Sequence, residues 1–187
     1  MERTLQGKRR MSGRIATTSF SRGLGWGLIG GLAGTIIMDL VLMGALSAVG
    51  LPALTCFSIV GNTVARLFSM KNMEIVSVIQ LGVVTHYLVG PLFGAIFGTL
   101  VTQVQALQAN TLKKSIILAI IYIEILSQPI LATAPILLKM TVPAIMQWYG
   151  GSTIMHLIMA VVLGSVVGYG LRLTPAGNRS NRGISSD

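Results

Sequence analysis

Charged side chains are scarce in this sequence, and acidic ones are scarcer still. Only 10% of the 187 residues are charged, and five are acidic, whereas about a quarter of the residues in a typical soluble domain are charged. The single cysteine, Cys56, excludes an intrachain disulfide and a CxxC metal motif. No GxSxG, HExxH or P-loop motif occurs, and no nucleophile–base pair is recognisable. These absences argue against a soluble domain and against an enzyme.

Hydrophobic residues make up 52% of the chain and gather in four long runs. Each run reaches the length of about 20 residues that a helix needs to cross a bilayer. We therefore predict an all-α polytopic membrane protein with four transmembrane helices, at about 24–49, 76–102, 115–138 and 149–171. Because the connections are short, the helices should form one bundle over residues 24–172.

Residues 1–23 form a basic leader before the first run. That run is longer than a signal-peptide core and contains Asp39, so we expect an uncleaved helix. Of the 14 lysines and arginines, eleven lie in the leader, the 103–114 loop or the tail, and three lie on the opposite side of the predicted bundle. This asymmetry predicts a multi-pass protein of the cell membrane, plasma or inner, with both termini in the cytoplasm. The basic residues lack interleaved aromatics, so we expect no nucleic-acid partner.

Two segments outside the spans have a recognisable character. Between the first two spans, apolar residues recur at three- and four-residue steps, which predicts an amphipathic helix on the outer surface of the membrane. The stripe consists of Leu54, Phe57, Val60, Val64, Leu67 and Phe68. Residues 173–187 are short, polar and rich in Ser, Asn, Arg and Gly, which predicts a disordered cytoplasmic tail.

Each of the four apolar runs carries an ionisable residue near its middle. They are Asp39, His86, Glu124 and His156. Such residues are costly at bilayer depth, so they usually face a bundle interior and often mark function. The rise per residue places Asp39, His86 and His156 in the outer half of the membrane. Glu124 is expected nearer the cytoplasm, with Gln128 one turn further on at the level of the histidines.

Small residues at four-residue spacing accompany three of these ionisable residues. Such rows allow membrane helices to approach closely, so we predict that they are helix contacts and that Asp39, His86 and His156 point into the bundle. The glycines of this prediction are Gly27 and Gly31 in the first span, Gly90, Gly94 and Gly98 in the second, and Gly164 and Gly168 in the fourth.

Four chemical interpretations of the polar residues remain open. His86, His156 and Asp39 could bind a metal ion, because imidazole and carboxylate ligands suit zinc, iron or manganese. The two histidines could ligate haem b. The same groups with Glu124 could form a proton path. Finally, Asp39–His86 and Glu124–His156 could be hydrogen-bonded pairs that only hold helices together.

A series of short motifs resembles the uncharacterised YagU-like inner-membrane proteins and related four-helix domains. The motifs are Gly34-Thr35, Met38-Asp39-Leu40, Val60-Gly61, Thr85-His86-Tyr87, Gly90, Phe93-Gly94, Gln128-Pro129, His156 and Gly164. The resemblance spans about residues 34–170 and implies a four-span fold with an intramembrane Asp/His pair. It implies no activity.

Two functions of different class follow. In the first, the chain is an accessory or structural subunit of a membrane complex, since its glycine rows offer more close-packing surface than four helices need among themselves. Its partners would be the lipid bilayer and other membrane subunits or a second copy. In the second, it is a small transporter or channel-like protein that handles protons or a metal ion through the polar residues.

Overall fold

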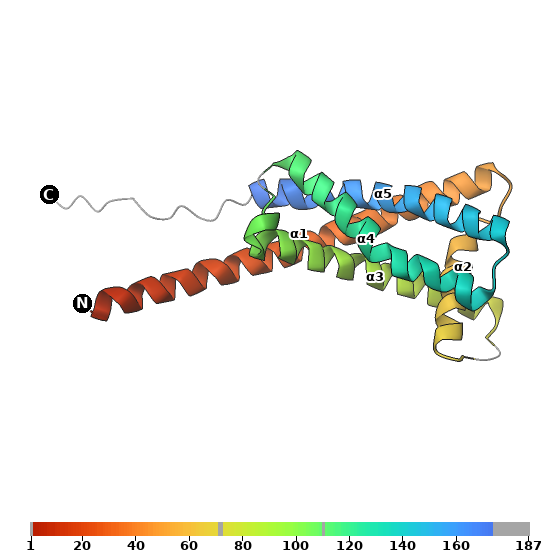
Figure 1. Ribbon diagram of the computed structural model, residues 1–187, viewed down its shortest axis with the longest axis horizontal. Coiled ribbons are helices and arrows are strands. Elements are labelled where there is room, and N and C mark those ends of the chain that lie inside the picture. Colours follow the sequence, from red (N-terminus) through yellow and green to blue (C-terminus); the bar gives the residue numbers. More distant parts are fainter. Residues whose placement is uncertain (1, 71–72, 110, 174–187) are drawn as a thin grey trace.

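The computed structural model describes residues 2–70, 73–109 and 111–173, with side chains described from Phe20 to Arg172 within these ranges. The described chain is helical throughout and contains no strand (Figure 1). Its elements are α1 (Glu2–Ala48), α2 (Thr55–Leu67), α3 (Ile75–Gln103), the short 3-10 helix η1 (Gln105–Leu107), α4 (Leu112–Leu138) and α5 (Val142–Leu173). The predicted disordered tail lies almost entirely outside the described residues.

Four of these helices are long and apolar enough to cross a membrane, which confirms the predicted fold class. Their spans are Phe20–Ala48, Ile75–Gln103, Leu112–Leu138 and Val142–Arg172. The last begins seven residues before the predicted start at Tyr149, with Pro143 in its first turn, where the lack of a backbone N–H costs little. At the other end of the chain, α1 continues back to Glu2, so the basic leader and the first span share one helix.

Local chemistry explains where the helices end. After α1, Gly50 adopts φ 74°, and the Leu51 N–H donates to the Leu46 carbonyl at 2.9 Å. The Thr111 hydroxyl caps the start of α4 by accepting from the Lys114 N–H at 3.1 Å. Lys139, in the left-handed conformation at φ 51°, ends α4. The turn at Lys139 leaves only three residues between α4 and α5, so these two spans run antiparallel.

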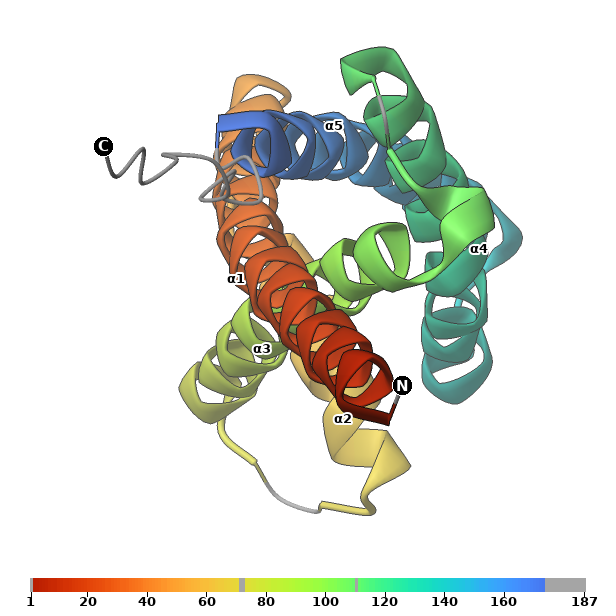
Figure 2. The ribbon, with the colours of Figure 1, turned by 90° about the vertical axis from the view of Figure 1, so that its left-hand side faces the viewer.

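The spanning helices pack in the order α3–α1–α5–α4. Helices α3 and α4 barely touch each other, so α4 has a spanning neighbour mainly on its α5 side, and it lies at the edge of the bundle in Figure 2. One polar contact joins α3 and α4 directly, from the Tyr122 hydroxyl to the Phe93 carbonyl at 3.1 Å. Helix α2 runs across the end of the bundle where α1 ends and α3 begins (Figure 1).

Helix α2 confirms that a helix lies between the first two spans, but its packed face differs from the predicted stripe. Phe57, Gly61 and Ala65 are buried, and α2 packs on α3 and α4. Leu67 and Phe68 are 59% and 67% exposed. The stripe identified Phe57 of this face but not Gly61 or Ala65, because apolar residues can contact either lipid or protein in a membrane, whereas backbone contact requires a small residue such as Gly61.

Candidate functional site

A row of glycines brings α1 and α3 into backbone contact and thereby fixes the position of Asp39. A Cβ on Gly27 would collide with the Gly94 carbonyl, and one on Gly31 with the Gly90 carbonyl. One turn further along this row of α1, the buried Thr35 hydroxyl donates to the Gly31 carbonyl at 2.9 Å. The next turn carries Asp39, which is 2% exposed. The sequence spacing of four residues therefore places a carboxyl group on the packed face of α1.

The Asp39 carboxyl group and the His86 imidazole meet between α1 and α3, where Asp39 Oδ1, Asp39 Oδ2 and His86 Nδ1 are buried without a hydrogen-bond partner among the described residues. His86 Nδ1 lies 3.3 Å from Asp39 Oδ1, and both side chains are largely buried. The Phe57 ring of α2 meets the imidazole edge-on, with ring centroids 5.7 Å apart. Exclusion of water strengthens any attraction between the two groups, and it also makes the charged form of each group more costly. Three elements thus converge on one carboxylate–imidazole pair.

Two further side chains of the spanning helices approach the pair. The Tyr87 side chain lies beside the Asp39 carboxyl group. His156 of α5 is close enough to His86 for the two rings to repel each other when both are protonated. Its Nδ1 atom is buried and has no hydrogen-bond partner among the described residues. The structure therefore brings Asp39, His86 and His156 into one neighbourhood.

The height of these residues along their helices agrees with a common site. Asp39 lies nine residues before the end of its span, and His86 and His156 lie 11 and 14 residues after the start of theirs. At the rise of an α-helix these separations correspond to about 14, 16 and 21 Å from the end of the bundle covered by α2. The site is therefore inside the spanning region and not at its surface.

Cys56 of α2 lies near enough to Asp39 to be affected by its charge. Removal from water, and to a smaller extent the carboxylate of Asp39, raise the pKa of the Cys56 thiol to about 12. Since the thiolate is the reactive form, this cysteine is a poor nucleophile and a poor metal ligand at neutral pH.

Glu124 and Gln128 lie apart from this neighbourhood. The Gln128 amide lies beside the Glu124 carboxyl group, one turn away on the same helix. Within the described ranges, no hydrogen bond or ion pair joins Glu124 to His156, and Glu124 Oε1 is buried without a hydrogen-bond partner. The face of α4 that meets α5 carries Ser115 and Ala119 instead, and the Ser115 hydroxyl donates to the Gly164 carbonyl at 2.8 Å.

Sequence reasoning missed three neighbours of the pair, namely Phe57, Tyr87 and Cys56. Tyr87 adjoins His86 in the chain, and this position could have identified it as a neighbour of the pair. Phe57 and Cys56 reach the site only because Gly61 and Gly82 allow α2 to pack against α3, with the Phe57 carbonyl against Gly82. Nothing in the spacing of the α2 residues points to a site on another helix.

The residues that the structure describes contain no group of three or more His, Cys, Asp or Glu side chains arranged to hold a metal ion. The metal site at Asp39, His86 and His156, and the haem site, stay predictions. A carboxylate–imidazole pair with a second imidazole nearby can nevertheless exchange protons without any bound group.

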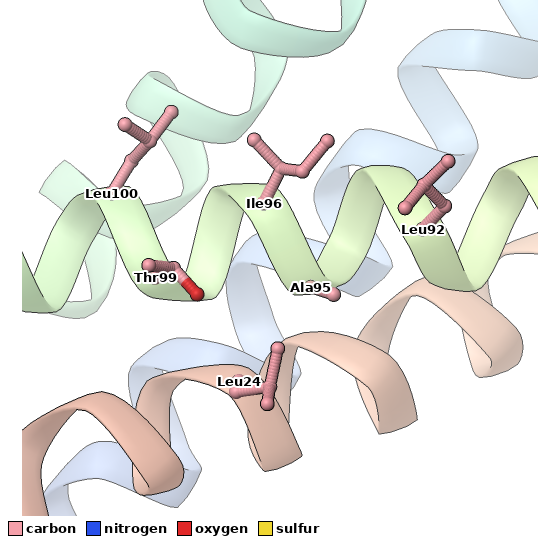
Figure 3. A pocket seen from close by; sticks show the side chains of 6 residues that line it. All are labelled: Leu24, Leu92, Ala95, Ile96, Thr99 and Leu100. Carbon is pink, nitrogen blue, oxygen red and sulfur yellow. The ribbon is translucent and has the colours of Figure 1, made fainter. Parts of the chain in front are cut away.

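A shallow groove on the outer side of α1 and α3 is the other concave feature of interest. Figure 3 shows Leu24 of α1 next to the side of α3 that carries Ala95 and Thr99, and three further residues of α3 complete the lining. The lining residues of α3 are Leu92, Ala95, Ile96, Thr99 and Leu100. The lining is apolar apart from the Thr99 hydroxyl, and it carries no ionisable group. The groove can therefore contact hydrocarbon chains, and its lining residues contain no group that could carry out catalysis or bind an ion.

Fold and site together define a small multi-pass integral membrane protein whose helices contact the lipid bilayer. Comparison with known proteins finds no matching family model, no matching curated sequence and no matching solved structure. The resemblance to YagU-like proteins accordingly stays a prediction, and the geometry of the site is the basis for assigning a function.

Proposed function

We propose that the protein is a small proton-binding transporter of the cell membrane, with the exchangeable proton held by Asp39 and His86. The observation that carries this proposal is the 3.3 Å approach of two ionisable, largely buried side chains, a carboxyl group and an imidazole, on different spanning helices. Intramembrane pairs of this kind commonly belong to proton relays and transport pathways.

The chemistry of the pair links proton binding to helix position. With one proton, the pair exists as carboxylate and imidazolium or as carboxylic acid and imidazole, and either form holds α1 and α3 together. A second proton gives a neutral acid beside an imidazolium ion, which removes the charge attraction. His156 supports the proposal because its buried Nδ1 atom lies nearby and lacks a partner among the described residues. Protonation would therefore loosen one helix contact and offer a second imidazole as acceptor.

An apolar core separates the site from the opposite end of the bundle, which favours a transporter over an open channel. The Thr35 and Ser115 hydroxyls are also buried, but each donates to a backbone carbonyl group. The buried apolar residues of this core come from α1, α3, α4 and α5. They are Met38, Phe97, Val101, Ala119, Ile123, Met155, Met159, Ala160, Leu163 and Val167. A proton can reach such a site from one side at a time, and passage to the other side requires a conformational change.

The proposal predicts proton flux that depends on the pair. In liposomes loaded with a pH-sensitive dye, the wild-type protein should dissipate an imposed pH gradient faster than protein-free vesicles. Asp39→Asn and His86→Gln should lower this flux about tenfold or more, as expected for loss of a proton-transfer group. Thr133→Val is the matched control, because it removes an exposed hydroxyl that bonds only within α4.

An infrared measurement separates a proton role from a defect in folding. The carboxylic-acid band of Asp39 should appear as the pH is lowered and should be absent from Asp39→Asn. Equal flux in wild type and Asp39→Asn, together with no pH-dependent carboxyl band, would exclude the proton role.

An accessory subunit is the second candidate function. The argument that the glycine rows exceed what the four helices need is weaker than the sequence suggested. The rows containing Gly27, Gly31, Gly94 and Gly164 pack against neighbouring helices within this chain. Other glycines still offer open space: a Cβ at Gly25, Gly44, Gly150 or Gly151 would meet nothing within 4 Å. These positions allow the close approach of a partner helix.

We infer from the charge asymmetry that both termini are cytoplasmic and that α2 lies on the outer side. Among the cations whose side chains are described, four lie at one end of the spans, namely Arg22, Lys113, Lys114 and Arg172, and two at the other, namely Arg66 and Lys139. A C-terminal reporter active only in the cytoplasm should therefore work, as should one inserted after Gln108. A reporter inserted after Met70 should be external. An external C-terminus would contradict the orientation.

A further inference from the structure

Helix α4 presents an unpaired face that contains polar side chains in the middle of the spanning region. Its buried face meets α5, and α3 barely touches it. On the opposite face, Ile117 and Ile121 are 45% and 52% exposed. Glu124 is half-buried and Gln128 is exposed on the same side. Glu124 lies 12 residues after the start of α4 and 14 before its end, which is close to the middle of the helix.

The spacing of these residues is that of a helix-pairing seam. Ile117, Ile121, Glu124 and Gln128 follow one another at steps of four, three and four residues. At about 100° per residue they occupy an arc of about 60°, roughly opposite Ala119 and Ile123, which pack in the core. A four–three alternation is the pattern of left-handed helix pairs. We call these four residues the α4 seam.

Hydrocarbon is a poor environment for this seam. A carboxyl group and a primary amide near the bilayer centre usually find protein partners. Glu124 lies beside Gln128, and its Oε1 atom is buried inside the chain, so the polar group that the seam presents to the membrane is chiefly the exposed amide of Gln128. One bond to Glu124 leaves further donors and acceptors of this amide open, and in hydrocarbon another helix would have to supply their partners.

We propose that a second copy of this chain covers the α4 seam, so that the protein forms a symmetric dimer through two α4 helices. Two copies in the same membrane orientation are related by a two-fold axis along the membrane normal, which sets each seam residue opposite its own counterpart. Gln128 lies one turn from Glu124, so the amide of each copy can donate to the Glu124 carboxyl group of the other. The donor and acceptor set is thus self-complementary.

The rest of the fold leaves room for this pairing. Helix α2 packs near the end of α4, where Arg66 donates to the Leu137 carbonyl at 3.2 Å. The seam ends at Gln128, more than two turns earlier, so α2 need not move. The Asp39–His86 pair lies between α1 and α3, so dimerisation and proton binding use different residues and can fail independently.

The first test is cross-linking in the membrane. In a Cys56→Ser background, Ile121→Cys places a thiol on the seam, and mild oxidation should give a disulfide-linked dimer. Leu88→Cys is the matched control, because it replaces a 66% exposed apolar residue in the middle part of α3. Preferential cross-linking of Ile121→Cys supports the proposal, and equal or stronger cross-linking of Leu88→Cys overturns it.

The second test measures dimerisation by energy transfer between labelled copies in liposomes over a range of protein-to-lipid ratios. Glu124→Leu and, separately, Gln128→Leu should each weaken the dimer about tenfold, as expected for loss of interhelical hydrogen bonds in a membrane. Helix content and thermal unfolding identify any variant that has lost its fold, and the other variant then decides the outcome. The proposal is overturned if the wild-type protein is monomeric at every protein-to-lipid ratio. It is also overturned if the variants that stay folded dimerise as strongly as the wild type.

Discussion

Replacing Gly94 by leucine is expected to destabilise the bundle by about 3 kcal/mol or more, at the upper end of overpacking effects. A Cβ at this position would collide with the Gly27 carbonyl and lie 2.7 Å from Gly31 Cα. Both neighbours are backbone atoms of α1, so no rotamer change can relieve the clash. The whole of α1 would have to move away from α3, and the Asp39–His86 pair about two turns further on would separate with it.

The matched control is Gly44→Leu, also in a spanning helix, where a Cβ would meet nothing within 4 Å. It should be neutral or slightly stabilising, since leucine favours the helix over glycine by close to 1 kcal/mol. Thermal unfolding in mild detergent measures both variants. Gly164→Leu should behave like Gly94→Leu, because its Cβ would lie 2.6 Å from Ile116 Cα of α4. Wild-type stability of both variants would show that the helices do not meet at these glycines.

The stability effects of Asp39→Asn and His86→Gln are expected to be strongly non-additive. Each single change leaves the other polar group buried without its charged partner, which typically costs about 1–3 kcal/mol. In the double variant fewer buried polar groups lack a partner. The second substitution should therefore lower the free energy of unfolding much less than the same substitution does in the wild type. The difference between the double change and the sum of the single changes measures the interaction of the pair.

A distant buried polar residue provides the control for this cycle. Ser115 lies in the α4–α5 contact, where its hydroxyl bonds to Gly164. The effects of Ser115→Ala and Asp39→Asn should therefore add. Additive losses for Asp39 and His86 as well would place these residues apart and remove the basis of the proposed site. Proton flux distinguishes the roles: a purely structural pair would leave flux unchanged in every variant that stays folded.

Part of the site follows from periodicity alone. Asp39 continues the row of Gly27, Gly31 and Thr35, and residues four apart share one face of a helix. Their sequence positions therefore sufficed to predict that Asp39 faces a neighbouring helix. They could not show which helix, because antiparallel partners with glycine rows are available in both α3 and α5.

Glu124 is a residue whose neighbours could not be predicted from residue spacing. It is an acidic residue of a spanning helix, like Asp39, yet it has no small-residue row of its own, and α4 turns Ser115 and Ala119 toward α5 instead. Its sequence position near mid-span suggested membership of one polar cluster. The preceding residue, Ile123, lies in the core, and Glu124 is turned about 100° from it because successive residues of a helix point about 100° apart. Within the described ranges no hydrogen bond or ion pair joins Glu124 to His156.

The sequence by itself determined that this chain is a helical membrane protein with four spans, because hydrophobic length is a local property that the bilayer converts directly into helices. Only the tertiary structure decided the order α3–α1–α5–α4, the pairing of Asp39 with His86 and the arrival of Phe57 over that pair. The physical reason is that lipid and protein are equally apolar partners for a hydrophobic side chain. Lateral neighbours are therefore selected by close backbone approach at a few glycines, whose partners are visible only in three dimensions.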